Sequence, residues 1–290
     1  MLYLLYMAGF FLAKIMPIRV CYAAAERIGR LYAKFAEKDR EGLRANLKVV
    51  LGEDVDETVV DKHTAAVFKN FAKYLADFFK FPRFTERNIS GNIELEGRKY
   101  MDECLSEGKG LILLSLHLGN WELGGAIVGG LKYPISAIVL EHTSKRVNGF
   151  FIRQRAINGL RSIPIGGRIK ECFELLKRNE VLAIVGDKDY TSSGIYVDFF
   201  GKKALMPKGP AVISLKTGAP IVFCALVRKK DDTYKFCFEK PIRFKSTGDH
   251  NEDIRALMGE YLAIFEKYIR ENPDQWYAFR KLWDQEEITQ

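Results

Sequence analysis

The sequence predicts an α/β fold, with a mixed central sheet flanked by helices and an N-terminal membrane-associated helical segment. Two observations predict the fold class: apolar runs of strand length alternate with helical patterns over residues 93–239, and 290 residues suit one α/β domain. A third observation, the absence of charge from Met1 to Ala13, predicts the N-terminal segment. We expect residues 1–20 to form an apolar membrane anchor and residues 21–290 a single α/β domain.

The N-terminal segment is short for a membrane span. As a helix that ends near Met16, it would be about 24 Å long, against roughly 30 Å of hydrocarbon in a bilayer. It could cross with its flanking cations snorkelling, or lie in the interface. From Lys14 to Lys48 there are nine Lys and Arg and four Asp and Glu, a net charge of plus five. This charge favours the cytoplasmic face of a membrane. The alternative is a buried N-terminal helix of a soluble protein.

The elements of the domain follow from periodicity in chain order. Apolar residues at helical spacing predict helices over 22–50 and 57–80, and alternation predicts a short strand over 93–96. Next come a helix from Gly97 to Gly108, strand 111–116, helix 120–130, strand 135–140, helix 149–159, helix 168–178 and strand 181–186. Pro210 and Gly218 bracket another helix. The chain ends with strands 221–228 and 234–239 as a hairpin and a helix from about Glu252 to Arg270.

His117 directly follows the strand over 111–116, at the edge where open α/β sheets usually bind ligands. On one continuous helix Glu122 would point about 140° away from it. The two can meet only if Asn120 caps a helix that begins after His117. Glu122 would then hold the imidazole, which could take a proton from a substrate hydroxyl, since the chain has no Gly-x-Ser-x-Gly nucleophile motif. Backbone N–H groups around Gly119 and Asn120 could stabilise an oxyanion. The alternative is a core histidine that caps its own helix.

Further motifs follow in a fixed order. They are Val185-Gly186-Asp187-Lys188-Asp189-Tyr190, Val197-Asp198-Phe199-Phe200-Gly201, Met206-Pro207-Lys208-Gly209-Pro210-Ala211, Thr217-Gly218-Ala219-Pro220-Ile221-Val222 and Gln275-Trp276-Tyr277-Ala278-Phe279-Arg280-Lys281-Leu282-Trp283. With His117 and Glu122, they resemble the lysophospholipid acyltransferase superfamily, in particular its lipid A biosynthesis late acyltransferase (lauroyl/myristoyl acyltransferase) branch. The second motif is similar to the branch's Phe-Phe-Gly loop. In the last motif, Ala278 and Phe279 depart from the branch's Gln-Trp-x-Trp-x-His/Arg-Arg-x-Trp string.

The resemblance implies a glycerol-3-phosphate acyltransferase-like fold and a reaction. A fatty acyl chain would move from an acyl carrier protein or coenzyme A thioester to a hydroxyl of a lipid A precursor or related glycolipid, in lipopolysaccharide biosynthesis at the cell inner membrane. His117 would be the general base and Glu122 its partner, with no metal, cofactor or covalent acyl-enzyme. The residues expected to bind substrate are Asn120, Arg155, Asp187, Asp189, Lys208 and Gly209. Arg155 is preferred to Arg153 because related acyltransferases carry an arginine at about this distance after the histidine.

Asp187 and Asp189 also support a rival hypothesis. Two aspartates one residue apart after a buried strand can hold a divalent cation against a nucleotide-sugar diphosphate. The protein would then be a metal-dependent glycosyltransferase, and His117 would be incidental. A non-catalytic membrane adaptor is the third class.

Composition limits the partners further. With 48% hydrophobic and 28% charged residues, the chain has the composition of a folded protein. Basic residues without any acidic one lie between positions 145 and 170, namely Lys145, Arg146, Arg153, Arg155, Arg161, Arg168 and Lys170. They suit phosphate head groups, an acidic protein or plain solvation, and no nucleic-acid-binding module accompanies them, so we expect no nucleic acid. Five cysteines without C-x-x-C spacing predict reduced thiols in the cytosol.

Overall fold

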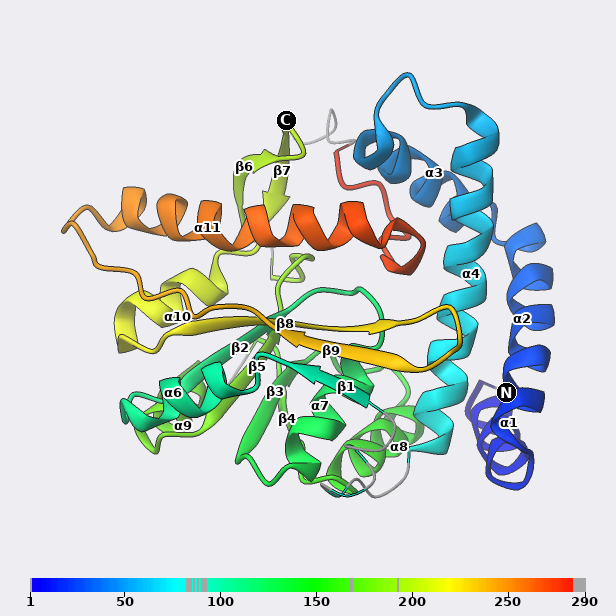
Figure 1. Ribbon diagram of the computed structural model, residues 1–290, viewed down its shortest axis with the longest axis horizontal. Coiled ribbons are helices and arrows are strands. Elements are labelled where there is room, and N and C mark those ends of the chain that lie inside the picture. The colour runs from blue at the N-terminus through cyan, green and yellow to red at the C-terminus, as the bar shows by residue number, and fades with distance from the viewer. Residues whose placement is uncertain are drawn as a thin grey trace.

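The architecture comes from a computed structural model that describes residues 2–81, 85, 87, 89, 93–166, 169–191 and 193–283. The helices are α1 Leu2–Ile15, α2 Ile18–Phe35, α3 Glu37–Leu51, α4 Glu57–Lys80, α6 Lys99–Ser106, α7 Trp121–Gly130, α8 Lys145–Ala156, α9 Ile169–Lys177, α10 Gly209–Thr217 and α11 His250–Glu271, and a 3₁₀ turn spans Pro273–Gln275. The strands are β1 Ile93–Glu96, β2 Leu111–Ser115, β3 Ile135–Val139, β4 Arg161–Pro164, β5 Val181–Val185, β6 Ile195–Phe199, β7 Lys202–Met206, β8 Ile221–Arg228 and β9 Tyr234–Phe238. Figure 1 shows a central layer of strands with helices on both sides and α1 to α4 at one end.

The central sheet has seven strands in the order β1-β9-β8-β2-β5-β3-β4. Strands β8, β2, β5, β3 and β4 run parallel to one another. Strand β9 is antiparallel to β8, and β1 is parallel to β9. The sheet is therefore mixed, as predicted, and helices flank it. Because β2 and β5 are parallel neighbours, the segments that follow them leave the sheet side by side, which places the functional site.

Two apolar cores cover the two faces of the sheet, because side chains along a strand alternate between faces. In β2, Ile112 and Leu114 belong to a core that includes residues of α9, α10 and α11. Leu111 and Leu113 belong to the other core, with residues of α6, α7 and α8. All five residues of β2 are buried. A strand buried on both faces gives the continuous apolar run by which it was predicted.

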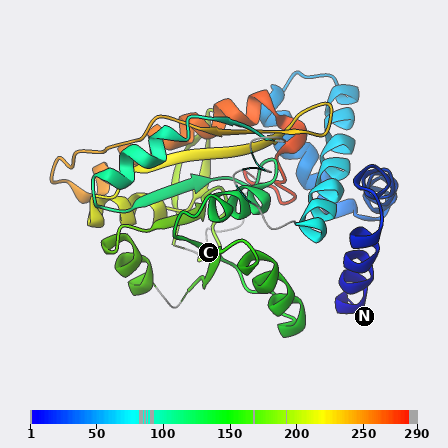
Figure 2. The ribbon, with the colours of Figure 1, turned by 60° about the horizontal axis from the view of Figure 1, so that its bottom comes forward.

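Helices α1 to α4 form a layer of their own beyond one end of the sheet (Figure 2). Helix α4 packs against α1, α2 and α3, and its range is the predicted 57–80, with Asp56 as a cap that accepts a hydrogen bond from the Thr58 N–H at 2.7 Å. The predicted helix over 22–50 is in fact two helices, because the chain leaves helical geometry at Ala36 (φ −90°, ψ 62°). Of the helices that the described residues form, none is long and apolar enough to cross a membrane.

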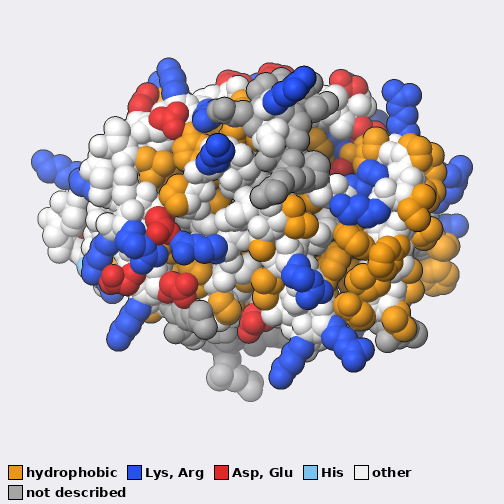
Figure 3. All heavy atoms as spheres, turned by 90° about the horizontal axis from the view of Figure 1, so that it is seen from below, with side chains coloured by type: hydrophobic (Ala, Val, Ile, Leu, Met, Phe, Trp, Pro, Cys, Tyr) orange, Lys and Arg blue, Asp and Glu red, His pale blue; other side chains and the backbone are white. Residues whose placement is uncertain are grey.

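One side of α1 packs on the domain and the other side is open. The Tyr6 ring lies 5.9 Å from that of Phe79, and the Phe10 ring lies 5.4 Å from that of Phe150. Large apolar side chains of α1 and α2 remain exposed, among them Leu4, Leu5, Phe11, Leu12, Ile15, Ile28, Leu31 and Phe35. Figure 3 shows a broad group of apolar side chains at this end of the molecule, on the right of the view.

Three strands have no counterpart among the predicted elements. Strand β4 is a four-residue strand at the sheet edge that ends in Pro164, where proline is tolerated but gives no strand signal. Strands β6 and β7 form a separate antiparallel pair at the segment expected to be a loop from the Phe-Phe-Gly motif.

The predicted helix over 168–178 is α9, except that residue 168 lies outside the described residues.

Candidate active site

His117 lies just beyond β2 in a loop that the surrounding chain holds on several sides. The Tyr277 N–H donates to the His117 carbonyl oxygen at 2.8 Å. Gly119 has a φ of +64°, and a Cβ there would lie 2.1 Å from the Leu226 carbonyl oxygen. Only glycine fits such a close approach in the left-handed region. The loop is therefore pressed against β8, and the position of His117 is tightly defined.

Asn120 caps α7, as predicted. Its side-chain oxygen accepts a hydrogen bond from the Leu123 N–H at 3.0 Å. Its amide nitrogen donates to Asp77 at 3.2 Å and to the Tyr234 hydroxyl at 3.3 Å, and the side chain is buried. The expected substrate-binding role of Asn120 is therefore replaced by a structural one, because both ends of its amide are engaged inside the fold.

The oxyanion donors expected around Gly119 and Asn120 were predicted wrongly. The Gly119 N–H donates to the Gln275 carbonyl oxygen, and the Asn120 N–H donates to the Leu226 carbonyl oxygen, both at 2.9 Å. These donors hold the loop to its neighbours instead of facing a substrate.

Asp187 is the acidic partner of His117. The two residues meet because Ser115 of β2 pairs in register with Val185 of β5, so that the positions two residues further on are neighbours. His117 Nδ1 lies 2.6 Å from Asp187 Oδ1, and the His117 backbone N–H donates to the same oxygen at 3.1 Å. The Trp276 indole N–H donates to Asp187 Oδ2 at 3.1 Å. The carboxylate is fully buried, whereas 16% of the His117 side chain is exposed.

Glu122, the partner expected for His117, contacts Arg155 instead. It lies in the first turn of α7, as predicted. Arg155 Nε donates to Glu122 Oε2 at 2.8 Å, and Arg155 Nη2 donates to Glu122 Oε1, while both residues are buried. The predicted hydrogen bond between Glu122 and His117 was wrong because a cation from α8 takes both oxygens of Glu122. The preference for Arg155 over Arg153 as the inward arginine is confirmed, since Arg153 is exposed.

The protonation states of the pair follow from burial and from their contact. Burial lowers the pKa of His117 below its usual value, although Asp187 pulls it upward. Burial alone would raise the pKa of Asp187, but the neighbouring His117, with Lys188 and the Trp276 donor, lowers it to about 2. Near neutral pH the carboxylate is therefore ionised and the imidazole neutral. Because Nδ1 then donates to Asp187, Nε2 is the nitrogen that can accept a proton.

A cavity of about 650 Å³ opens beside His117. The polar residues of its lining include His117, Glu122, Arg155, Lys188 and Asp189. Apolar side chains of the sheet also line it, including Leu113, Ala137, Ile184, Cys224, Leu226 and Phe236. On α7 the lining residues include Gly124 and Gly125, and a Cβ at Gly125 would lie 2.9 Å from the Leu160 side chain. The small residues of α7 thus bring this helix close to its neighbours beside the cavity.

The other predicted residues divide between the cavity and other places. Asp189 lines the cavity, but its carboxylate is used by the Thr191 N–H and hydroxyl, each at 2.8 Å, and by the Gly194 N–H at 2.7 Å. Gly209 lines the cavity at the start of α10. Lys208 lines a different cavity, next to Arg255, so the structure does not bring it to His117.

Two residues that hold the site together, Gln275 and Trp276, were not among the predicted site residues. Trp276 donates to Asp187, and the Gln275 side chain accepts from the Arg228 N–H at 2.9 Å and donates to the Arg228 carbonyl oxygen at 2.8 Å. These residues begin the Gln-Trp motif singled out in the sequence. Its order in the chain was visible, but its contact with the histidine loop was not.

The basic segment between positions 145 and 170 is mostly solvated. Lys145, Arg146, Arg153 and Lys170 are exposed, and Arg168 lies outside the described residues. Arg161 pairs with Glu180, so part of the positive charge is compensated.

The rival metal site lacks support in the geometry. The Asp187 oxygens accept from His117 and Trp276, and those of Asp189 accept from their own loop. Within the described ranges, no three His, Cys, Asp or Glu residues cluster as a metal site would require.

Comparisons with known proteins find similar sequences over nearly the whole chain. The family described as bacterial lipid A biosynthesis acyltransferase matches residues 1–285. The phosphatidylinositol mannoside acyltransferase of Mycolicibacterium smegmatis is 25% identical over 96% of this chain and 90% of its own. The lipid A biosynthesis palmitoleoyltransferase of Escherichia coli is 23% identical over 90% of this chain and 84% of its own. The lipid A biosynthesis acyltransferase of Haemophilus influenzae is 22% identical over 90% and 80%.

Proposed function

This chain belongs to the bacterial lipid A biosynthesis acyltransferase family, and we propose that it moves a fatty acyl chain from a thioester to a hydroxyl of a lipid A precursor or related glycolipid. The family makes the protein an acyltransferase, so the glycosyltransferase and adaptor hypotheses are set aside. The observation that carries the proposal is the His117–Asp187 pair beside a largely apolar cavity. The thioester would be carried by an acyl carrier protein or coenzyme A.

In the proposed mechanism His117 is the general base. Its Nε2 takes the proton of the acceptor hydroxyl while the hydroxyl oxygen attacks the thioester carbonyl carbon. Asp187 holds the Nδ1 hydrogen and stabilises the imidazolium that forms. The tetrahedral intermediate then collapses, the carbon–sulfur bond breaks, and the imidazolium returns the proton to the thiolate. The products are an ester and a free thiol, without an acyl-enzyme.

Glu122 and Arg155 have a supporting role in this proposal. Both line the cavity, and Glu122 orients the guanidinium through two hydrogen bonds. The Arg155 side chain also lies over the Phe151 ring, with 5.7 Å between Cζ and the ring centroid. A guanidinium held in this way suits the phosphate of either substrate. Gly209, at the amino end of α10, lies where the helix dipole favours a negatively charged group.

The apolar part of the cavity is the proposed site of the acyl chain. Leu113, Cys224, Leu226 and Phe236 line the cavity, and apolar walls with a few polar groups match a substrate that has a hydrocarbon tail and a polar reacting group. This arrangement would place the thioester carbon near His117 and the methyl end among the sheet side chains.

The membrane is the proposed location of the reaction. The exposed apolar side chains of α1 and α2 include Leu5, Phe11 and Ile15, and each would contribute about 1.5–3 kcal/mol on burial in a bilayer. Basic residues of the following segment add about 1 kcal/mol each near anionic lipid. We propose that residues 1–20 lie in the membrane interface on the cytoplasmic face of the inner membrane.

Mass spectrometry of reaction products tests the proposed function. Purified protein is incubated with acyl coenzyme A or acyl carrier protein thioesters and with a lipid A precursor or a phosphatidylinositol mannoside. The expected product is one of these acceptors with one additional acyl chain, and one free thiol should be released for each acceptor that is acylated. The His117→Ala variant, expected to fold because the side chain lies beyond the strand end, should form none. Thiol release without an acylated glycolipid would contradict the proposed acceptor class.

A further inference from the structure

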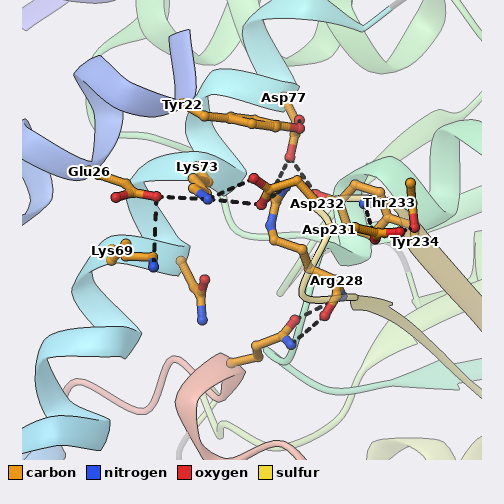
Figure 4. Close-up of polar contacts among 12 residues, drawn as sticks. Tyr22, Glu26, Lys69, Lys73, Asp77, Arg228, Asp231, Asp232, Thr233 and Tyr234 are labelled. Atoms are coloured by element: carbon orange, nitrogen blue, oxygen red, sulfur yellow. Dashed lines mark hydrogen bonds and ion pairs between the residues drawn. The ribbon is translucent and has the colours of Figure 1, made fainter. Parts of the chain in front are cut away.

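A buried cluster of charged and hydroxyl side chains lies behind the His117 loop, where α2, α4 and the β8–β9 hairpin meet (Figure 4). Asp77 of α4 is its centre. One oxygen accepts from the Tyr22 hydroxyl at 2.5 Å. The other accepts from Arg228 Nη2, from the Tyr234 hydroxyl and from the Asn120 amide at 3.2 Å. A single carboxylate thus joins a helix of the N-terminal layer, the hairpin and the residue that caps α7.

Asp77 is connected to the His117 loop by its hydrogen bond with Asn120. This residue follows His117 by three positions, and its cap on the Leu123 N–H fixes the start of α7. A second route supports the first, since the backbone N–H of Arg228 donates to the Gln275 side chain and its backbone carbonyl accepts from it, while the Gln275 carbonyl oxygen accepts from the Gly119 N–H of the loop. The loop is therefore held from behind by groups that converge on the Asp77–Arg228 ion pair.

The same cluster fixes α2. Besides Tyr22, Glu26 of α2 lies 2.9 Å from Lys73 Nζ of α4, and Lys73 in turn binds Asp232 of the hairpin at 2.8 Å. The Lys73 side chain is 6% exposed, whereas those of Glu26 and Asp232 are 30% and 33% exposed. Ile28, Leu31 and Phe35 of α2 are exposed. Helix α2 thus combines a partly buried polar attachment to the domain with exposed apolar side chains.

From these contacts we infer that Asp77 is a positioning residue, because it holds the His117 loop through Asn120. The hydrogen bond from Tyr22 makes this positioning depend on how α2 packs against the domain. The inference rests on the proposed role of His117 as the base. A displacement of about 1 Å in a catalytic group can cost on the order of 100-fold in rate. Loose packing of α2 against the domain would therefore lower turnover without removing any group that touches a substrate.

The test compares two tyrosines of α2. Tyr22→Phe removes the hydroxyl that binds Asp77, and the ring that lies 4.8 Å from the Arg228 guanidinium is kept. Tyr32→Phe is the matched control, because its hydroxyl also donates to an aspartate, Asp39 at 3.0 Å, but at an exposed place outside the cluster. We expect kcat to fall about 3- to 10-fold in Tyr22→Phe, with an unchanged KM for the thioester, and to stay unchanged in Tyr32→Phe.

A second variant shows whether Tyr22 acts through Asn120. Asn120→Ser keeps a side-chain oxygen that can cap α7, but removes the amide that binds Asp77. Adding Tyr22→Phe to Asn120→Ser should then lower kcat less than 1.5-fold further, whereas independent effects would multiply. Equal kcat in the two tyrosine variants, or full multiplication in the double variant, would overturn the inference. If the wild-type protein transfers no acyl chain to any acceptor, the proposed function fails instead, and the two failures are distinct.

Discussion

The Asp187→Asn substitution tests whether Asp187 or Glu122 is the acidic partner of His117. Asp187 accepts three N–H donors: two from His117 on Oδ1 and the Trp276 indole on Oδ2. An amide offers one accepting oxygen and one donating nitrogen in the same place. If the oxygen stays with Trp276, the amide nitrogen faces His117 Nδ1 and favours the tautomer with hydrogen on Nε2. That tautomer cannot take a proton from the acceptor.

The size of the effect follows from the lost charge. Two unit charges about 4 Å apart interact by about 4 kcal/mol at an effective dielectric constant of about 20. The ionised Asp187 gives this stabilisation to the imidazolium that forms during transfer, and a tenfold change in rate corresponds to about 1.4 kcal/mol. We therefore expect kcat to fall on the order of 10³-fold in Asp187→Asn. Glu122→Gln should act differently, since it leaves the buried Arg155 without its counter-charge, which costs about 3–5 kcal/mol of stability.

The assay measures thiol release and acylated product for both variants, together with their thermal unfolding. Asp187→Asn should lose turnover and keep a cooperative transition, whereas Glu122→Gln should unfold at lower temperature and keep part of its activity at a temperature where it is folded. Full activity in Asp187→Asn, combined with a 10³-fold loss in folded Glu122→Gln, would refute the pairing of His117 with Asp187.

Three further outcomes are expected. Because burial lowers the pKa of His117 and the base must be neutral, the plateau of kcat/KM should extend from neutral pH to below pH 6.5, and kcat/KM should fall only at lower pH. A plateau that ends above pH 7 in the pH–rate profile would contradict this. Replacing Leu5, Phe11 and Ile15 together by Ser should release the protein from vesicles in a flotation assay, whereas 1 M salt should leave the wild type bound, because apolar burial outweighs screened charge; release of the wild type by salt alone would reverse that order. Cys224→Phe should shift the preference among thioesters toward shorter chains, because the larger ring fills the apolar part of the cavity that Cys224 lines; an unchanged chain-length profile would place the acyl chain elsewhere.

Local signals in the sequence predicted local features of the structure well. The cap at Asn120, the helix over 57–80 and the first-turn position of Glu122 each depend on a few consecutive residues. The break at Ala36 is also local, but the apolar spacing continues across it, so periodicity alone joins α2 and α3. The β6–β7 hairpin lies outside the main sheet, and the alternation of apolar and polar residues along its two short strands was too weak to predict them.

The partner of His117 depends instead on which strands are neighbours. Asp187 lies 70 positions away, and it meets His117 only because β5 lies directly beside β2 and pairs with it from Leu111↔Val181 to Ser115↔Val185. Periodicity identifies both strands but contains no information about their order in the sheet or their register. Glu122 was the better candidate on sequence distance, yet Arg155 reaches it from α8 and satisfies its charge. A buried carboxylate takes the nearest cation or N–H donor in space, so the assignment of acid to base required the three-dimensional order of the strands.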